Sequence, residues 1–102
     1  MDALAFTPGP WEHFDTGMSF AVAHKSDFYR ITSLPYLPND RQGYMQAEAN
    51  ARLIASAPNM LAALREIEAH HVKLNAEAGR AEERSHTLSI ARAAIAAATG
   101  QA

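Results

Sequence analysis

The chain has 102 residues and a formal net charge of −2, from nine Lys and Arg against eleven Asp and Glu. This length predicts one domain, residues 1–102, or a module that completes its core by pairing with copies of itself. The charge removes the basic balance of a general nucleic-acid binder. Without cysteine there are no disulfides, thiolate metal sites or cysteine nucleophiles. No apolar run approaches the length of about 18 residues that a membrane span requires, so we expect a soluble, intracellular protein.

Aromatic residues and alanines divide the chain into two parts of different composition. All eight aromatic residues lie within residues 1–44, whereas 18 of the 22 alanines lie within residues 47–102. Aromatic residues favour strands and alanine favours helices. The composition therefore predicts an α+β fold, with an aromatic half of strands and loops over residues 1–43 and a helical half over residues 44–102.

The first half has the pattern of a small antiparallel sheet of two to three strands. The prolines at positions 8 and 10 predict a rigid turn before Trp11, where a strand begins. Residues 18–23 alternate in polarity like a half-buried strand, and residues 28–33 form its partner. Residues 34–43, with two further prolines, are the most loop-like segment.

The second half predicts three helices, of which the last two form an antiparallel, alanine-rich pair. The first helix runs from about Tyr44 to Ala55, and the second starts near Pro58 with Ser56 as its cap. The third helix covers residues 80–98. An apolar seam with spacings of four and three follows the second helix: Met60, Leu64, Ile67, His71, Leu74 and Ala78.

Two segments resemble those of a known group of proteins. They are Thr7-Pro8-Gly9-Pro10-Trp11 and residues 48–64, which begin Glu-Ala-Asn-Ala-Arg-Leu-Ile-Ala and continue through Ser-Ala-Pro-Asn to a leucine helix. Together they resemble small accessory proteins of tailed phages and prophages, and the middle segment is similar to Ead-type early proteins of lambdoid phages. The resemblance implies a phage protein in the host cytoplasm that takes part in the contest with host defences or in early takeover of the host, and it implies no catalytic residue.

Six residues have the chemistry to bind a nucleotide, because arginine holds phosphate and aromatic rings stack on bases. They are Trp11, Arg30, Tyr36, Arg41, Tyr44 and Arg52. Each also has a structural interpretation: Trp11 can fill the core, Arg52 can pair with Glu48, and the others can be solvated loop residues. Asn50 lies on the apolar stripe of the first helix, so we expect its amide to be buried and hydrogen-bonded, to the backbone or to a ligand.

Motifs of enzymes and metal sites are absent from the sequence. There is no glycine-rich phosphate loop, no G-x-S-x-G and no H-E-x-x-H, so we expect neither an enzyme nor a cofactor. His70 and His71 are adjacent, which directs them about 100° apart on a helix and hinders joint chelation. Glu66 and Glu68 add only one carboxylate to each histidine. We therefore predict no metal site within one chain.

These observations lead to two hypotheses. In the first, a homo-oligomer sequesters a small nucleotide-type signal of host defence: Trp11 or Tyr44 stacks on the base, and Arg30, Arg41 or Arg52 holds phosphate. In the alternative, the protein inhibits a host defence or metabolic enzyme through an exposed helix face or the loop at residues 34–43. Nucleic-acid binding is a third possibility that the net charge disfavours.

Overall fold

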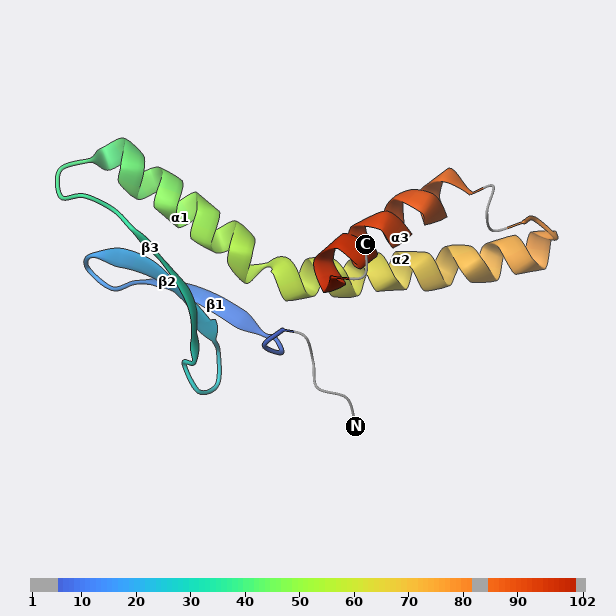
Figure 1. The fold of residues 1–102 in the computed structure, drawn as a ribbon, viewed down its shortest axis with the longest axis horizontal. Coiled ribbons are helices and arrows are strands. Elements are labelled where there is room, and N and C mark those ends of the chain that lie inside the picture. The colour runs from blue at the N-terminus through green and yellow to red at the C-terminus, as the bar shows by residue number, and fades with distance from the viewer. Residues whose placement is uncertain (1–5, 82–84, 101–102) are drawn as a thin grey trace. The chain divides into compact units, whose positions relative to one another are not determined.

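The computed structural model of the chain describes residues 6–81 and 85–100. A three-stranded antiparallel sheet is followed by three helices, which confirms the predicted α+β fold (Figure 1). The chain divides into two compact units, residues 1–59 and residues 60–102. The expectation of a single domain stays a prediction. None of the described helices is long and apolar enough to cross a membrane.

The sheet has the strand order β1-β2-β3, with β1 at Trp11–Asp15, β2 at Ser19–His24 and β3 at Arg30–Pro35. The predicted strand positions are therefore correct to within about two residues. The prediction that β2 is half-buried is wrong, because Ala21 and Ala23 are as fully buried as the residues between and before them.

The reason for this difference lies in the register of β1. Phe14 stands opposite Ala21 and Glu12 stands opposite Ala23. An alanine side chain is short, so larger neighbours on the adjoining strand remove it from solvent on the face of the sheet opposite α1. Both faces of β2 are thereby buried.

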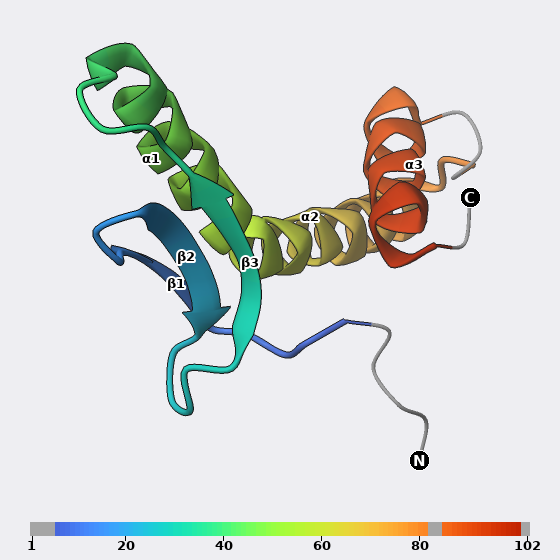
Figure 2. The same cartoon turned by 60° about the vertical axis from the view of Figure 1, so that its left-hand side comes forward.

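Helix α1 (Arg41–Ala55) lies along one face of the sheet (Figure 2). Its buried residues are Ala47, Ala51 and Ala55, and they pack against Phe20 and Val22 of β2. The small alanine side chains let the helix approach strands that carry the bulky residues. The hydrophobic effect of this core therefore comes mainly from the side chains of the sheet.

The expectation that Asn50 is buried is wrong, because its side chain is exposed. Ile54 of α1 packs against the core, but the fully buried face of the helix consists of Ala47, Ala51 and Ala55. Leu53 is 61% exposed. The orientation of α1 is thus decided mainly by the close packing of its alanines.

The two segments that carry the resemblance meet in the first unit. The turn before β1 contains a cis peptide bond between Gly9 and Pro10. A Cβ atom at Gly9 would lie 2.9 Å from Cβ of Pro58, near the start of α2 (Ala57–Ala78). The Ser56 hydroxyl donates to the Arg52 carbonyl oxygen, so Ser56 caps the end of α1 and does not cap the next helix as expected.

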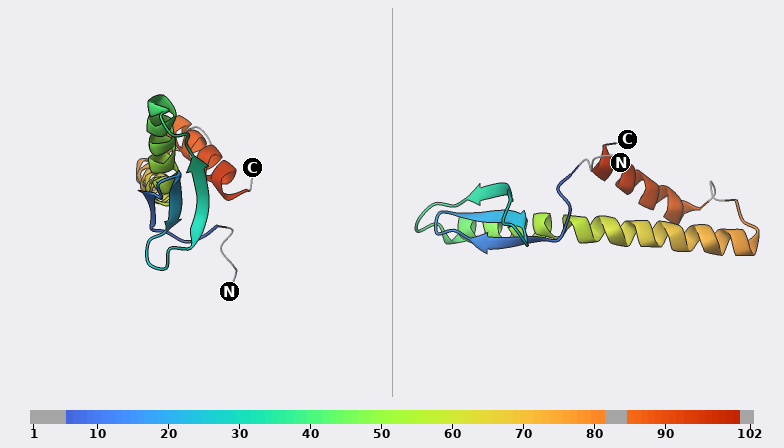
Figure 3. Two further views of the ribbon diagram at one scale, coloured as in Figure 1. Left: turned by 90° about the vertical axis from the view of Figure 1, so that its left-hand side faces the viewer. Right: turned by 90° about the horizontal axis from the view of Figure 1, so that it is seen from below.

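In the second unit, α3 (His86–Thr99) runs antiparallel beside α2, as predicted (Figure 3). Glu68 of α2 accepts a hydrogen bond from Arg92 of α3 at 2.9 Å. Helix α3 begins later than expected, because Ser85 is its N-cap and accepts from the Leu88 N–H. Gly100, with φ of 77°, ends it as predicted.

The buried face of α2 differs from the predicted seam. Leu64 and His71 are half-buried, but Met60, Ile67 and Leu74 keep 43%, 43% and 42% of their surface exposed. Leu61 and Asn75 are buried in their place. The buried residues keep the predicted heptad spacing, but the buried face of α2 is rotated by about one residue. A periodic pattern alone does not determine which face of a helix packs against its neighbour.

Replacing Gly9 with alanine is expected to destabilise the first unit, because the new Cβ would overlap Pro58. Overpacking of this kind costs about 1–3 kcal/mol. The free energy of unfolding in urea measures the effect. Pro58→Gly removes the opposing Cβ atom, so the double variant should lose less stability than the sum of the two single variants. Additive losses would contradict the proposed contact.

Candidate functional site

The structure brings together three of the six residues selected as ligand candidates. Tyr36, Arg41 and Tyr44 line a hollow of about 310 Å³ in the first unit, between the end of β3 and the start of α1. Its other lining residues are Leu37, Pro38, Asn39 and Asp40. Trp11, Arg30 and Arg52 do not line it. The ligand role of all six residues stays a prediction.

The two tyrosines of this hollow share one hydrogen-bond acceptor. The Asp15 carboxylate, at the end of β1, accepts from the Tyr36 hydroxyl at 2.6 Å and from the Tyr44 hydroxyl at 3.2 Å. It also accepts from the Gly17 N–H at 2.8 Å. The tyrosine rings meet edge to face with centroids 4.8 Å apart, and both contact Phe20. The cluster ties β1, β3 and α1 to the core.

The hydrogen bonds shift the ionisation of all three side chains. The bond from Tyr36, with that from Gly17, lowers the pKa of Asp15. The same bond to Asp15 raises the pKa of Tyr36 to about 12. The pKa of Tyr44 is raised first by burial and then by its bond to Asp15. At neutral pH the cluster is therefore an ionised carboxylate held by two neutral hydroxyls.

This hollow is poorly suited to a phosphate group. Its polar tyrosine atoms already donate to Asp15, and the Asp40 side chain accepts from the Gly43 N–H at 2.9 Å, which caps the start of α1. An anion approaching Arg41 would meet two carboxylates in the same region, so Coulomb repulsion opposes binding. The two hydrogen bonds to Asp15 give the tyrosines a structural role that their composition alone did not indicate.

The other three candidates have contacts elsewhere in the first unit. The Trp11 indole N–H donates to the Thr7 carbonyl oxygen at 3.0 Å, and its ring packs against the core. Arg30 is exposed and donates to the Ser33 hydroxyl. Arg52 lies 3.8 Å from Glu48, which is the helix pair that the sequence offered as an alternative.

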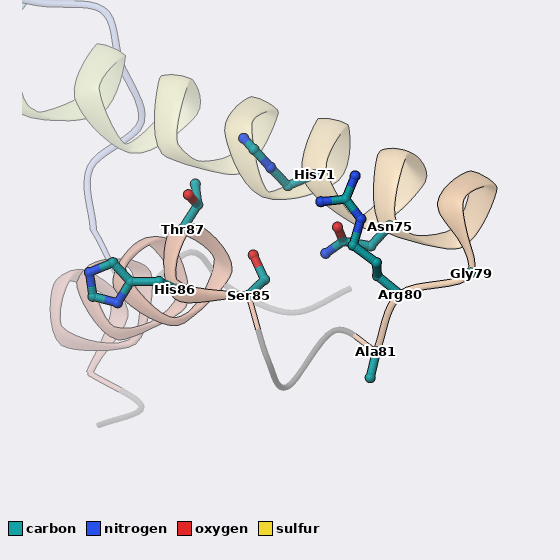
Figure 4. A pocket seen from close by; sticks show the side chains of 8 residues that line it. All are labelled: His71, Asn75, Gly79, Arg80, Ala81, Ser85, His86 and Thr87. Carbon is teal, nitrogen blue, oxygen red and sulfur yellow. The ribbon is translucent and has the colours of Figure 1, made fainter.

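A larger hollow lies in the second unit, where α2 ends and α3 begins (Figure 4). Its volume is about 710 Å³. The lining residues are His71, Asn75, Gly79, Arg80, Ala81, Ser85, His86 and Thr87. We refer to this hollow as the hairpin pocket.

The hairpin pocket is rich in groups that donate hydrogen bonds. Arg80 contributes a guanidinium, His71 and His86 contribute imidazoles, and Thr87 contributes a hydroxyl. Helix α3 begins here, and the N–H groups of a helix's first turn lack partners within the helix. None of the described residues that line the pocket carries a carboxylate. Its described lining thus presents one positive charge and several hydrogen-bond donors.

The pocket was not predicted from the sequence, because the predicted third helix starts at residue 80 and so leaves no turn around Arg80. Two local signals could have found it: Gly79, which ends α2 with φ of 70°, and Ser85, which stands three residues before the buried Leu88 as an N-cap. Asn75 falls four residues after His71, on the same helix face.

Metal binding gains no support from the described part of the chain. No group of three or more histidine, cysteine or acidic side chains that could hold a metal ion occurs among residues 6–81 and 85–100. The absence of a metal site stays a prediction.

Comparison with known families defines the class of the protein. The chain matches, over residues 1–102, the family model described as Salmonella phage P22 protein Y8K6. It is therefore a small phage protein with an α+β fold, which confirms the phage origin that the resemblance implied. The chain belongs to the family of this P22 protein. No curated protein and no solved structure matches it.

The Asp15→Asn substitution is expected to lower the pKa of Tyr36 from about 12 towards its ordinary value of 10.0, because the charged acceptor is lost. Absorbance of tyrosinate during an alkaline titration measures this, in a Tyr29→Phe background that leaves only the two clustered tyrosines. Unchanged titration curves would contradict the shared acceptor.

The same shift predicts how stability depends on pH. Tyr36 has a higher pKa in the folded chain than in the unfolded chain, so its contribution is complete below pH 10 and is lost as the pH rises towards 12. The urea midpoint should fall over this range, and it should fall less in Tyr36→Phe. An equal fall in both proteins would contradict the prediction.

Proposed function

We propose that this phage protein is a binding protein of the host cytoplasm that sequesters a small nucleotide-type signal and thereby counters host defence. The observation that supports this proposal is the hairpin pocket, whose described lining combines positive charge with hydrogen-bond donors. Ligand pockets usually measure about 300–1,000 Å³, so a volume of about 710 Å³ suits a nucleotide. The resemblance to Ead-type early proteins agrees with an early role in infection.

The proposal gives the phosphate-binding role to Arg80 rather than to Arg30, Arg41 or Arg52. Arg52 is paired with Glu48, and Arg41 lies in a hollow where carboxylates oppose an anion. Arg80 lines the pocket together with the start of α3. Guanidinium groups and helix N-termini both stabilise bound phosphate. The chemistry is that of binding without catalysis or a cofactor.

The proposed binding protein is a homo-oligomer. Met60, Ile67 and Leu74 are spaced seven residues apart on α2, and each remains more than two-fifths exposed. Stripes with this spacing pair helices in coiled coils, so a second copy would bury them. Ile67→Glu is therefore expected to reduce the molar mass measured by light scattering to that of a monomer. A wild-type chain that is itself monomeric would contradict this part of the proposal.

Native mass spectrometry of the protein with linear, cyclic and ADP-ribose-derived nucleotides tests the function. One ligand mass per pocket is expected for at least one nucleotide. Arg80→Gln should weaken binding by at least about tenfold, the effect of about 1.4 kcal/mol. Arg52→Gln removes the same charge outside the pocket and should bind like the wild type. No retained nucleotide, or equal losses in both variants, would contradict the proposal.

A second candidate function, inhibition of a host enzyme by direct contact, is favoured by exposed apolar residues in the first unit. Leu37, on the loop at residues 34–43, is 70% exposed, and Met45 on α1 is 55% exposed. Exposed apolar residues can anchor a partner protein. A stoichiometric host protein captured by the wild type but lost with Leu37→Ser would favour inhibition over sequestration.

A further inference from the structure

We propose that the hairpin pocket contains a subsite for a phosphate group, formed by the start of α3, the Arg80 side chain and the side-chain amide of Asn75. The subsite lies in the pocket to which the proposed function assigns a nucleotide, so the identity of the complete ligand rests on that proposal. The subsite is nevertheless expected to bind inorganic phosphate alone, so that the two proposals can be tested separately.

The first observation is an unsatisfied amide. Asn75 is only 6% exposed, and its Nδ2 atom has no hydrogen-bond partner in the part of the chain that the structure describes. Buried polar atoms are almost always hydrogen-bonded, because leaving one unpaired costs about 1–3 kcal/mol. The amide lines the hairpin pocket, and Figure 4 shows it pointing from α2 towards Ser85. A ligand oxygen in the pocket would supply the missing acceptor.

The second observation is the N-terminus of α3 on the opposite wall. This helix has 14 residues and carries partial positive charge at its start. The Ser85 hydroxyl accepts from the Leu88 N–H, and Leu88 is 1% exposed, which fixes the first turn in place. The N–H groups of His86 and Thr87 precede Leu88 and have no carbonyl partner within the helix. They are available to an anion.

The third observation is the attachment of Arg80 to Asn75. The Arg80 N–H donates to the Asn75 carbonyl oxygen at 2.8 Å, and the Gly79 N–H donates to the Ala76 carbonyl oxygen at 3.3 Å. With Gly79 at φ of 70°, these bonds form a Schellman motif that ends α2. The motif holds the Arg80 backbone one turn from the unpaired amide. Cation and amide donor are therefore positioned by the same hydrogen bonds.

These donors match a phosphate group better than a carboxylate. A tetrahedral oxyanion presents oxygen atoms in several directions, so it can accept from α3, from Arg80 and from Asn75 at the same time. Phosphate groups are bound by combinations of arginine and helix N-termini in many folds. The imidazoles of His71 and His86 line the same pocket and can donate to further oxygen atoms. The ligand class is a phosphate monoester.

Calorimetric titration of the full chain with inorganic phosphate, at constant ionic strength set by chloride, tests the subsite. Phosphate is expected to bind the wild type. Asn75→Leu should weaken binding at least tenfold and also raise the urea midpoint of the free protein, since it removes an unpaired buried donor. This opposite change in binding and stability separates a ligand contact from a purely structural role.

Arg80→Gln is the second variant, and it carries the test if Asn75→Leu does not fold. It should weaken phosphate binding at least tenfold, whereas the matched variant Arg65→Gln, at an exposed position of α2 outside the pocket, should not. The subsite is overturned if the wild type does not bind phosphate or if both Asn75→Leu and Arg80→Gln bind it normally. Phosphate binding without retention of any nucleotide would support the subsite and overturn only the proposed nucleotide ligand.

Discussion

The first unit depends on a single carboxylate that serves two tyrosines. Asp15 accepts hydrogen bonds from Tyr36, which follows β3, and from Tyr44, which lies in the first turn of α1. With their hydroxyls satisfied, both rings can lie half-buried on Phe20 without the cost of an unpaired polar group. One charged residue of β1 thereby joins the segment after β3 to the start of α1. The buried alanines of α1 form the core together with Phe20 and Val22.

The sequence allows the elements of this fold to be predicted better than the faces that they bury. Alternating polarity located the strands, and Pro58 located the break between α1 and α2, because both effects are local to the backbone. The exposure of Asn50 and the rotation of the seam on α2 could not be predicted in the same way. They depend on which neighbouring element packs closest, and alanine-rich helices offer more than one face that allows such packing.

The candidate site shows the same difference between local and tertiary information. Arginine and tyrosine on a proline-rich loop indicated a binding site, and Tyr36, Arg41 and Tyr44 do meet in one hollow. The same residue types can also stabilise the fold, as the hydrogen bonds from Tyr36 and Tyr44 to Asp15 do. The sequence alone does not distinguish this structural role from ligand binding. The hairpin pocket combines residues from two helices and the turn between them, so no single segment of sequence reveals it. Its distinguishing feature, the unpaired Nδ2 of Asn75, exists only in the folded chain.

The proposed function and the phosphate subsite both require that the hairpin pocket receives an anion. Proton and nitrogen NMR spectra of the labelled full chain, recorded during addition of inorganic phosphate, test it most directly. We expect the largest chemical shift changes at the side-chain amide of Asn75 and at the backbone amides of His86 and Thr87. Changes concentrated at Arg41 and Tyr44 instead, or no saturable change in the hairpin pocket, would contradict it.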